Sequence, residues 1–168
     1  LVTYYVLFVI HLSTRFVHIA GVTTAPNGAF MKQVARNLTD VGDGFLSNKA
    51  FLIMDRDTKY TDGFRDFLDR EGVKPVRCPV RAPNCNAFAE RFVRSIKDEC
   101  LDRFILFGEA SLRRALREYG AHYHSERNHQ GVGNQLLRPV ATANSTDEPV
   151  QCHERLGGML NYYYREAA

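Results

Sequence analysis

Two acidic residues stand where a metal-ion site could form. Asp55 directly follows the apolar run Phe51 to Met54, so its carboxylate lies at the mouth of the strand that this run predicts. A charged carboxylate packs poorly against the apolar core. Where several carboxylates converge, however, they provide the oxygen ligands that a hard divalent cation prefers. Glu90 belongs to the first turn or so of a predicted helix, and the loop before that helix, residues 83–86, can approach the strand end. The spacing therefore predicts that Asp55 and Glu90 meet at one site.

The helix that carries Glu90 is predicted to run from Ala87 to about Arg103, and it has two faces. The apolar stripe consists of Phe88, Phe92 and Ile96. At 100° per residue, a second stripe within an arc of roughly 60° consists of Glu90, Arg94 and Lys97. Two interpretations stay open for this second stripe. It is either a solvated i,i+4 ion pair between Glu90 and Arg94, or a metal-binding acid beside cations that contact phosphate.

The residues around both acids resemble a known family. Asp55 ends an apolar strand, 34 residues intervene, and Glu90 then occurs in the pattern N-x-x-A-E-R-F-x-x-S-I-K. This combination resembles the catalytic core of integrases and DDE transposases, in particular bacterial insertion-sequence transposases. The segment Ile10 to Gly21 resembles the second and third strands of that core, and Tyr123 to His129 resembles its Tyr-Asn-x-x-Arg-x-His region. The resemblance extends from about Val2 to Arg138.

The resemblance implies an α/β protein with an RNase H-like mixed sheet and flanking helices. Three strands would form an antiparallel meander, and two further strands would lie parallel to the first. Family members hold two Mg²⁺ ions, or Mn²⁺, with three carboxylates and cleave and join DNA strands. By this resemblance Asp55 and Glu90 are catalytic metal ligands. The DNA-binding residues that it implies are Arg94, Lys97, Asn84 and Asn86. For the two asparagines, loop and cap hydrogen bonds are an equally good interpretation.

The sequence departs from the family pattern at its start. The first catalytic Asp of the family lies on a strand before the meander's second strand, and this sequence begins where that second strand should begin. We therefore expect residues 1–127 to be a catalytic core without its first, central strand, and residues 128–168 to be a C-terminal extension or tail. Two functions remain open. The chain belongs either to a transposase that cuts and joins DNA, or to a non-catalytic DNA-binding or subunit-association fragment of a decayed transposase.

The remaining elements follow from hydrophobic periodicity. The runs Val2 to Ile10 and Phe16 to Val22 predict a hairpin whose first strand is buried on both faces. Thr61 is the expected N-cap of a short helix, and Pro75 makes the strand Val73 to Cys78 an edge strand. The other expected helices carry the apolar residues Phe30, Met31, Val34, Ala35 and Leu38, or span Glu109 to about Glu126. Beyond Arg127 the pattern is that of a surface or mobile tail.

Composition sets wider bounds. The net charge of +3 argues only weakly for a polyanionic partner, so DNA, as mobile-element ends and target duplex, is implied by the resemblance rather than by charge. The same resemblance implies a homo-oligomer when the core is complete. The four cysteines form no C-x-x-C pair and are interpreted as reduced thiols. The longest apolar run, Tyr4 to Ile10, is too short to span a membrane, so we expect an intracellular protein, and the resemblance implies that it is cytoplasmic, bacterial and nucleoid-associated.

Several other residues could do chemistry but lack support. Asp57 is interpreted as a turn former, because the family pattern has a non-acidic residue there. His122, His124 and His129 have no cysteine or acid at a spacing that would complete a metal site. The tyrosines at 162–164 could stack on bases, although packing against the core is the more common use of such residues.

Overall fold

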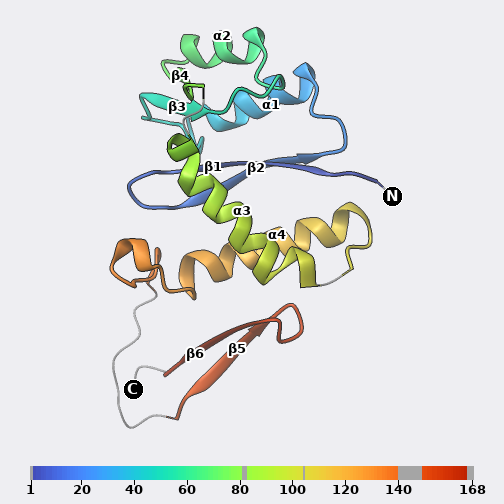
Figure 1. The fold of residues 1–168 in the computed structure, drawn as a ribbon, viewed down its shortest axis with the longest axis vertical. Coiled ribbons are helices and arrows are strands. Elements are labelled where there is room, and N and C mark those ends of the chain that lie inside the picture. The colour runs from blue at the N-terminus through green and yellow to red at the C-terminus, as the bar shows by residue number, and fades with distance from the viewer. Residues whose placement is uncertain (1, 81–82, 104, 140–148, 166–168) are drawn as a thin grey trace. The chain divides into compact units, whose positions relative to one another are not determined.

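The computed structural model describes residues 2–80, 83–103, 105–139 and 149–165 of the chain as a mixed α/β protein (Figure 1). The chain divides into two compact units. Residues 1–9 and 18–90 form the first unit, and residues 10–17 and 91–168 form the second. Each unit is described by itself.

The secondary structure follows the order of the chain. The strands are β1 (Tyr5–Ile10), β2 (Val17–Thr23), β3 (Phe51–Met54), β4 (Lys74–Arg77), β5 (Gln151–Arg155) and β6 (Leu160–Tyr164). The α-helices are α1 (Gly28–Leu38), α2 (Asp62–Arg70), α3 (Ala87–Glu99) and α4 (Gly108–Ser125). Short 3₁₀ helices are η1 (Pro83–Asn86), η2 (Leu101–Arg103) and η3 (Gln130–Val132).

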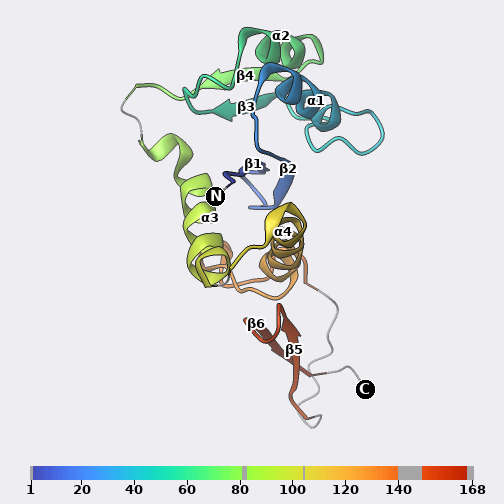
Figure 2. The same ribbon diagram turned by 90° about the vertical axis from the view of Figure 1, so that its right-hand side faces the viewer.

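In the first unit, α1 and α2 pack against each other and lie beside β3 and β4 (Figures 1 and 2). Asn27 and Thr61 cap the two helices, each accepting a hydrogen bond from the backbone N–H three residues on. The cap at Thr61 confirms the sequence prediction. The core between these elements includes nine buried side chains: Met31, Val34, Ala35, Leu38, Leu46, Met54, Phe64, Leu68 and Val73.

Strand β3 pairs in parallel with β4, with Ile53 opposite Val76, while β1 and β2 form a separate two-stranded sheet. The hairpin and the edge position of β4 agree with the sequence predictions. The prediction of a strand buried on both faces is wrong for β1, because its residues are only partly buried or exposed. The apolar run of β3 also reads as a buried strand in the sequence, and this is wrong, since Phe51 is 62% and Ile53 42% exposed. In a two-stranded sheet the second face and the outer edges lack the neighbours that would cover them.

In the second unit, the packed faces of α3 and α4 are aromatic. The Phe92 ring meets the Tyr123 ring edge-on at a centroid distance of 5.1 Å, and Tyr119 is fully buried beside them. Phe92 and Ile96 are buried as predicted, whereas Phe88 is exposed. Helix α3 ends at Glu99, before the predicted end, and the chain continues as the 3₁₀ turn η2.

The chain after α4 contains a β-hairpin that the sequence did not predict. Strands β5 and β6 pair antiparallel, with His153 opposite Tyr162, and β6 lies against α4 (Figure 1). The Tyr162 and Tyr164 rings stack on each other at 5.6 Å, and Tyr163 is 65% exposed on the other side of the strand. Short alternating strands give a weak sequence signal, so a tail was expected in their place.

Candidate carboxylate site

Asp55 is the first residue after β3, as the sequence predicted, and its side chain is exposed. Its Oδ1 accepts a hydrogen bond of 3.0 Å from the backbone N–H of Asp57. This Asx turn fixes the direction in which the carboxylate leaves the strand. The second oxygen, Oδ2, has no hydrogen-bond partner among the residues that the structure describes. Asp55 is thus held in place with one oxygen available to a ligand.

Asp57 has a different role. Its carboxylate accepts the Lys59 backbone N–H at 2.9 Å and forms an ion pair with the Lys59 ammonium. Hydrogen bonding to the Lys59 side chain is the main cause that lowers the Asp57 pKa below its ordinary value. The carboxylate is already paired with a cation in the turn, which agrees with its prediction as a turn former.

The negative charge at the end of β3 also raises the pKa of two nearby side chains. Burial raises the pKa of Tyr60, and the charges of Asp55 and Asp57 raise it further, so this phenol stays protonated. Cys78, directly after β4, donates its backbone N–H to the Met54 carbonyl at 2.9 Å. Burial raises the pKa of the Cys78 thiol, and Cys85 and Asp55 add to the shift. The parallel pairing of β3 and β4 therefore places Cys78 close to Asp55.

Glu90 lies in the first turn of α3, as predicted, and is exposed. Its carboxylate forms no hydrogen bond or ion pair with any described residue, so the expected alternative of a Glu90–Arg94 pair is not found. The helix N-terminus favours a negative charge at this position. Asp55 and Glu90 both belong to the first unit and offer oxygen ligands of the kind that a hard cation prefers. The structure gives no contact between the two carboxylates.

The predicted phosphate contacts are exposed on the same helix. Arg94 and Lys97 form no ion pair with a carboxylate in the described part of the chain. Asn84 is exposed and Asn86 partly buried in η1, and neither side-chain amide bonds to a described residue. The alternative of loop and cap hydrogen bonds for these asparagines therefore has no support in the described contacts.

Comparison with protein families identifies this region. Residues 71–136 match the model of the integrase core domain. This part of the chain is therefore similar to the integrase core domain. The match contains Glu90 and the four candidate DNA contacts, whereas Asp55 lies before it. No curated protein matches the chain. Among the described residues no helix combines the length and the apolar character needed to cross a membrane.

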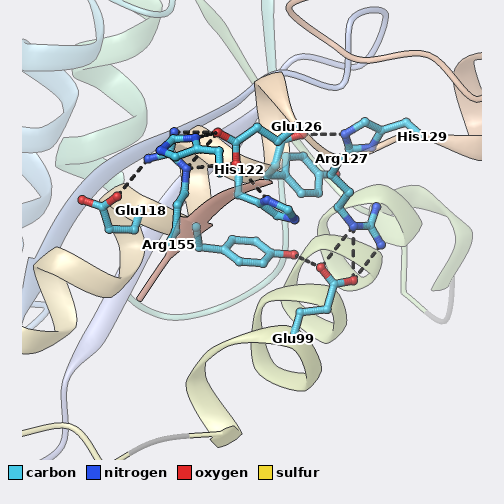
Figure 3. A network of polar contacts seen from close by, with 10 residues as sticks. Glu99, Glu118, His122, Glu126, Arg127, His129 and Arg155 are labelled. Carbon is cyan, nitrogen blue, oxygen red and sulfur yellow. Dashed lines mark hydrogen bonds and ion pairs between the residues drawn. The ribbon is translucent and has the colours of Figure 1, made fainter. Parts of the chain in front are cut away.

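Within the integrase core match, the C-terminal end of α3 is anchored to the end of α4 (Figure 3). The Arg127 guanidinium donates to both oxygens of Glu99, with its shortest contact at 2.7 Å, and the Tyr119 hydroxyl donates to Glu99 at 3.0 Å. A charge-assisted pair with two donors on one carboxylate restricts the rotation of α3. The sequence resemblance included Arg127 but did not reveal its partner.

A second network fixes the β5–β6 hairpin to α4 (Figure 3). The Glu126 side chain is only 6% exposed and accepts from Arg155 at 2.7 Å, from His122 at 3.0 Å and from His153 at 3.0 Å. Arg155 also reaches Glu118 at 2.9 Å. Hydrogen bonds from Arg155 and His122 hold the Glu126 pKa below its ordinary value against the opposing effect of burial. The sequence alone missed Glu126 and Arg155, because 28 residues separate them.

The three histidines of this region act separately, so they are not joint ligands. His122 bonds to Glu126, His129 bonds to the Tyr123 carbonyl at 2.6 Å, and the Val17 N–H donates to His124 Nε2 at 3.1 Å. The described residues contain no group of three histidine, cysteine or acidic side chains that could hold a metal ion. Each histidine instead joins a different part of the second unit.

Proposed function

We propose that this chain is the catalytic part of a transposase or integrase that cuts and joins DNA strands, with Asp55 and Glu90 as metal ligands. Support comes chiefly from Glu90, which lies in the first turn of α3 within the integrase core match and has no ion-pair partner among the described residues. The parallel pair β3–β4, with Asp55 at its end, is compatible with an RNase H-like sheet.

The two carboxylates are suitable ligands for the metal ions that promote phosphodiester cleavage. A phosphodiester resists nucleophilic attack because it is negatively charged, and bound Mg²⁺ or Mn²⁺ would supply Lewis-acid stabilisation of that charge. Asp55 contributes an oxygen held by the turn after β3, and Glu90 contributes one from a helix start. Their exposure leaves room for a large substrate. Both ligands are carboxylates, as Mg²⁺ prefers.

The DNA contacts in this proposal come from α3 and the turn before it. Arg94 and Lys97 hold backbone phosphates by charge, and Asn84 and Asn86 offer amide groups to the strand that is cut. The duplexes are the ends of a mobile element and its target. Two such ends must be brought together, so we propose a homo-oligomer associated with the bacterial nucleoid as the working form.

Thermal melting with and without Mg²⁺ or Mn²⁺ tests the metal site. A cation that binds only the folded chain at ten times its Kd stabilises it by about 1.4 kcal/mol, so the melting temperature should rise on addition. The double variant Asp55→Asn with Glu90→Gln should lose that rise. The matched control, Asp66→Asn with Asp69→Asn on exposed positions of α2, should keep it. Equal shifts in the wild type and the first double variant would refute a shared Asp55–Glu90 site.

Nicking of a supercoiled plasmid distinguishes the enzyme from a non-catalytic DNA-binding fragment. Cleavage should need Mg²⁺ or Mn²⁺ and should disappear in Glu90→Gln. A chain that binds the plasmid equally well with and without metal, and does not nick it in either condition, would be the binding fragment.

A further inference from the structure

The outward side of α4 carries exposed arginines. The buried side chains of this helix include Leu112, Ala115, Leu116, Tyr119, His122 and Tyr123. At 100° per residue, Arg114 and Arg117 lie within an arc of about 60° on the opposite side of the helix. Ala110 and Ala121 share that arc, so only small side chains precede and follow the two arginines along it. Arg114 and Arg117, named here the arginine face of α4, can therefore both be reached by an extended surface.

The acidic residues near the arginine face already have partners. Glu118 accepts a hydrogen bond from Arg155 of β5 at 2.9 Å, and its other oxygen lies 3.4 Å from the Arg117 guanidinium. Even so, the Arg117 side chain is 71% exposed. Arg114 is exposed and forms no hydrogen bond or ion pair with a described residue. Because Arg155 offsets the negative charge of Glu118, the arginine face keeps a net positive charge that an anionic partner can neutralise.

The arginine face points away from the cations of α3. The Phe92 ring of α3 packs against the rings of Tyr119 and Tyr123 on α4, so the buried sides of the two helices face each other. Arg94 and Lys97 lie about half a turn from Phe92 around α3, on its exposed side. Packed helix axes are about 8–10 Å apart and a helix has a radius of about 5–6 Å, so the two basic surfaces are roughly 20 Å apart. A straight duplex on α3 therefore cannot also cover the arginine face.

We propose that Arg114 and Arg117 bind the phosphate backbone of a second DNA duplex, separate from the duplex that α3 contacts. The guanidinium group binds phosphate oxygens in a bidentate manner, and a duplex presents phosphates at short, regular intervals whatever its sequence. The choice of duplex DNA rests on the proposed function, in which an element end and a target must both be held. It also rests on the position of both arginines within the integrase core match.

A bridging assay without divalent metal tests the second site. The chain is mixed with one duplex on beads and with a fluorescent duplex of unrelated sequence, and the fluorescence kept on the beads is measured. Arg114→Gln with Arg117→Gln should reduce this fluorescence by about tenfold, because two phosphate contacts are lost. Arg114→Lys with Arg117→Lys keeps both charges and should keep most of the bridging.

A second control removes the same charge elsewhere. Lys32→Gln with Arg36→Gln on the exposed side of α1 should bridge as the wild type does. A homo-oligomer that held both duplexes on the α3 cations of two copies would bridge equally well in the wild type and in Arg114→Gln with Arg117→Gln. That result would overturn the proposal, and it would equally be the result if the arginine face bound an acidic protein instead of DNA.

Titration with a short labelled duplex, followed by fluorescence anisotropy, gives the number of duplexes bound per chain. The wild type should bind two, whereas Arg114→Gln with Arg117→Gln and Arg94→Gln with Lys97→Gln should each bind one. One duplex per wild-type chain would overturn the proposal. Bridging that depends on Arg114 and Arg117, in a chain without metal-dependent nicking, would support the second site and refute only the catalytic function. Metal-dependent nicking without bridging would do the reverse.

Discussion

Asp55 and Asp57 have the same side chain and lie two residues apart, yet the turn after β3 gives them different partners. Asp57 forms an ion pair with Lys59. Asp55 accepts a hydrogen bond from one backbone N–H, and its other oxygen has no partner among the described residues. Charge pairing makes a carboxylate less available to a cation, because the cation must displace the existing partner. Local turn geometry therefore separates the candidate ligand from the structural acid.

The exposed cations of α3 give a prediction about DNA. Each phosphate contact that is lost should reduce the salt dependence of duplex binding, so Arg94→Gln with Lys97→Gln should flatten the slope of log K against log salt by about two units. Fluorescence anisotropy with a labelled duplex at several salt concentrations measures this slope. The matched control is Lys32→Gln with Arg36→Gln on the exposed side of α1. An unchanged slope in the α3 variant would show that Arg94 and Lys97 do not contact phosphate and only form a solvated face of the helix.

His124 gives a prediction about pH. Burial and the nearby Arg138 charge lower its pKa to about 4. The ring stacks on Phe16 at 4.0 Å, and its Nε2 accepts the Val17 N–H. Unfolded His124, with a pKa of about 6.5, takes up a proton first as the pH falls. Its contribution to stability is thus fully present above pH 6.5 and is lost between about 6.5 and 4.

His124→Gln should therefore flatten the fall in the free energy of unfolding over that pH range. Glutamine keeps an acceptor for the Val17 N–H but does not titrate. One proton limits the change in slope to about 1.4 kcal/mol per pH unit, and the partial exposure of His124 reduces it. Urea unfolding at half-unit pH steps measures the slope. His18 and His129 also have lowered pKa values, so some dependence should remain. If the free energy of unfolding falls equally steeply with pH in the wild type and in His124→Gln, His124 is not the group that titrates.

At the scale of elements, helix α3 is anchored at one end and carries the candidate ligand at the other. Glu99 is held by Arg127 and Tyr119, while Glu90 in the first turn pairs with no residue in the part of the chain that the structure describes. A helix is stiff over nine residues, so a contact that orients Glu99 also limits the rotation of α3 about its axis. The Glu99–Arg127 pair is thus a means of positioning the face that carries Glu90, Arg94 and Lys97.

The β5–β6 hairpin depends on a largely buried ion pair. Arg155→Ala would leave the Glu126 carboxylate with only its histidine donors, and removing one partner of a buried pair costs up to about 3–5 kcal/mol. Because His122 and His153 remain, we expect a loss of about 2 kcal/mol in the free energy of unfolding, measured in urea. The exposed pair of Arg113 with Glu109 provides the control, and Arg113→Ala should cost less than about 1 kcal/mol. Equal losses in the two variants would show that the hairpin is not held by Arg155.

At the scale of the whole molecule, the first unit buries one core beneath two small sheets rather than one large sheet. The described strands β1–β2 and β3–β4 form separate pairs, so each pair has outer edges without a strand partner. Phe51 and Ile53 add exposed apolar side chains on β3. Open edges with apolar neighbours bind other strands readily, which makes the first unit a site for association.

We therefore expect the chain to self-associate as its concentration rises. Ile53→Lys places a charge on the exposed face of β3 and should shift the molecule toward monomer, because a charged side chain discourages strand pairing. Light scattering after size-exclusion chromatography measures the mass. Val41→Lys, at an almost fully exposed position outside any strand, is the control and should not change it. Equal association in wild type and Ile53→Lys would place the interface elsewhere.

The sequence by itself determined the local features. The cap Thr61, the faces of α3 and the carboxylate after β3 depend on residues a few positions apart, and period and cap chemistry reveal such features directly. Only the tertiary structure decided which residues meet across long separations. Glu126 binds Arg155 and Glu99 binds Arg127, and each contact depends on how helices, strands and turns pack. The burial of Phe51 and Ile53 was predicted wrongly because it, too, depends on neighbours that are distant in the sequence. An apolar run shows that a strand can be buried, but the number of neighbouring strands determines whether both of its faces are covered.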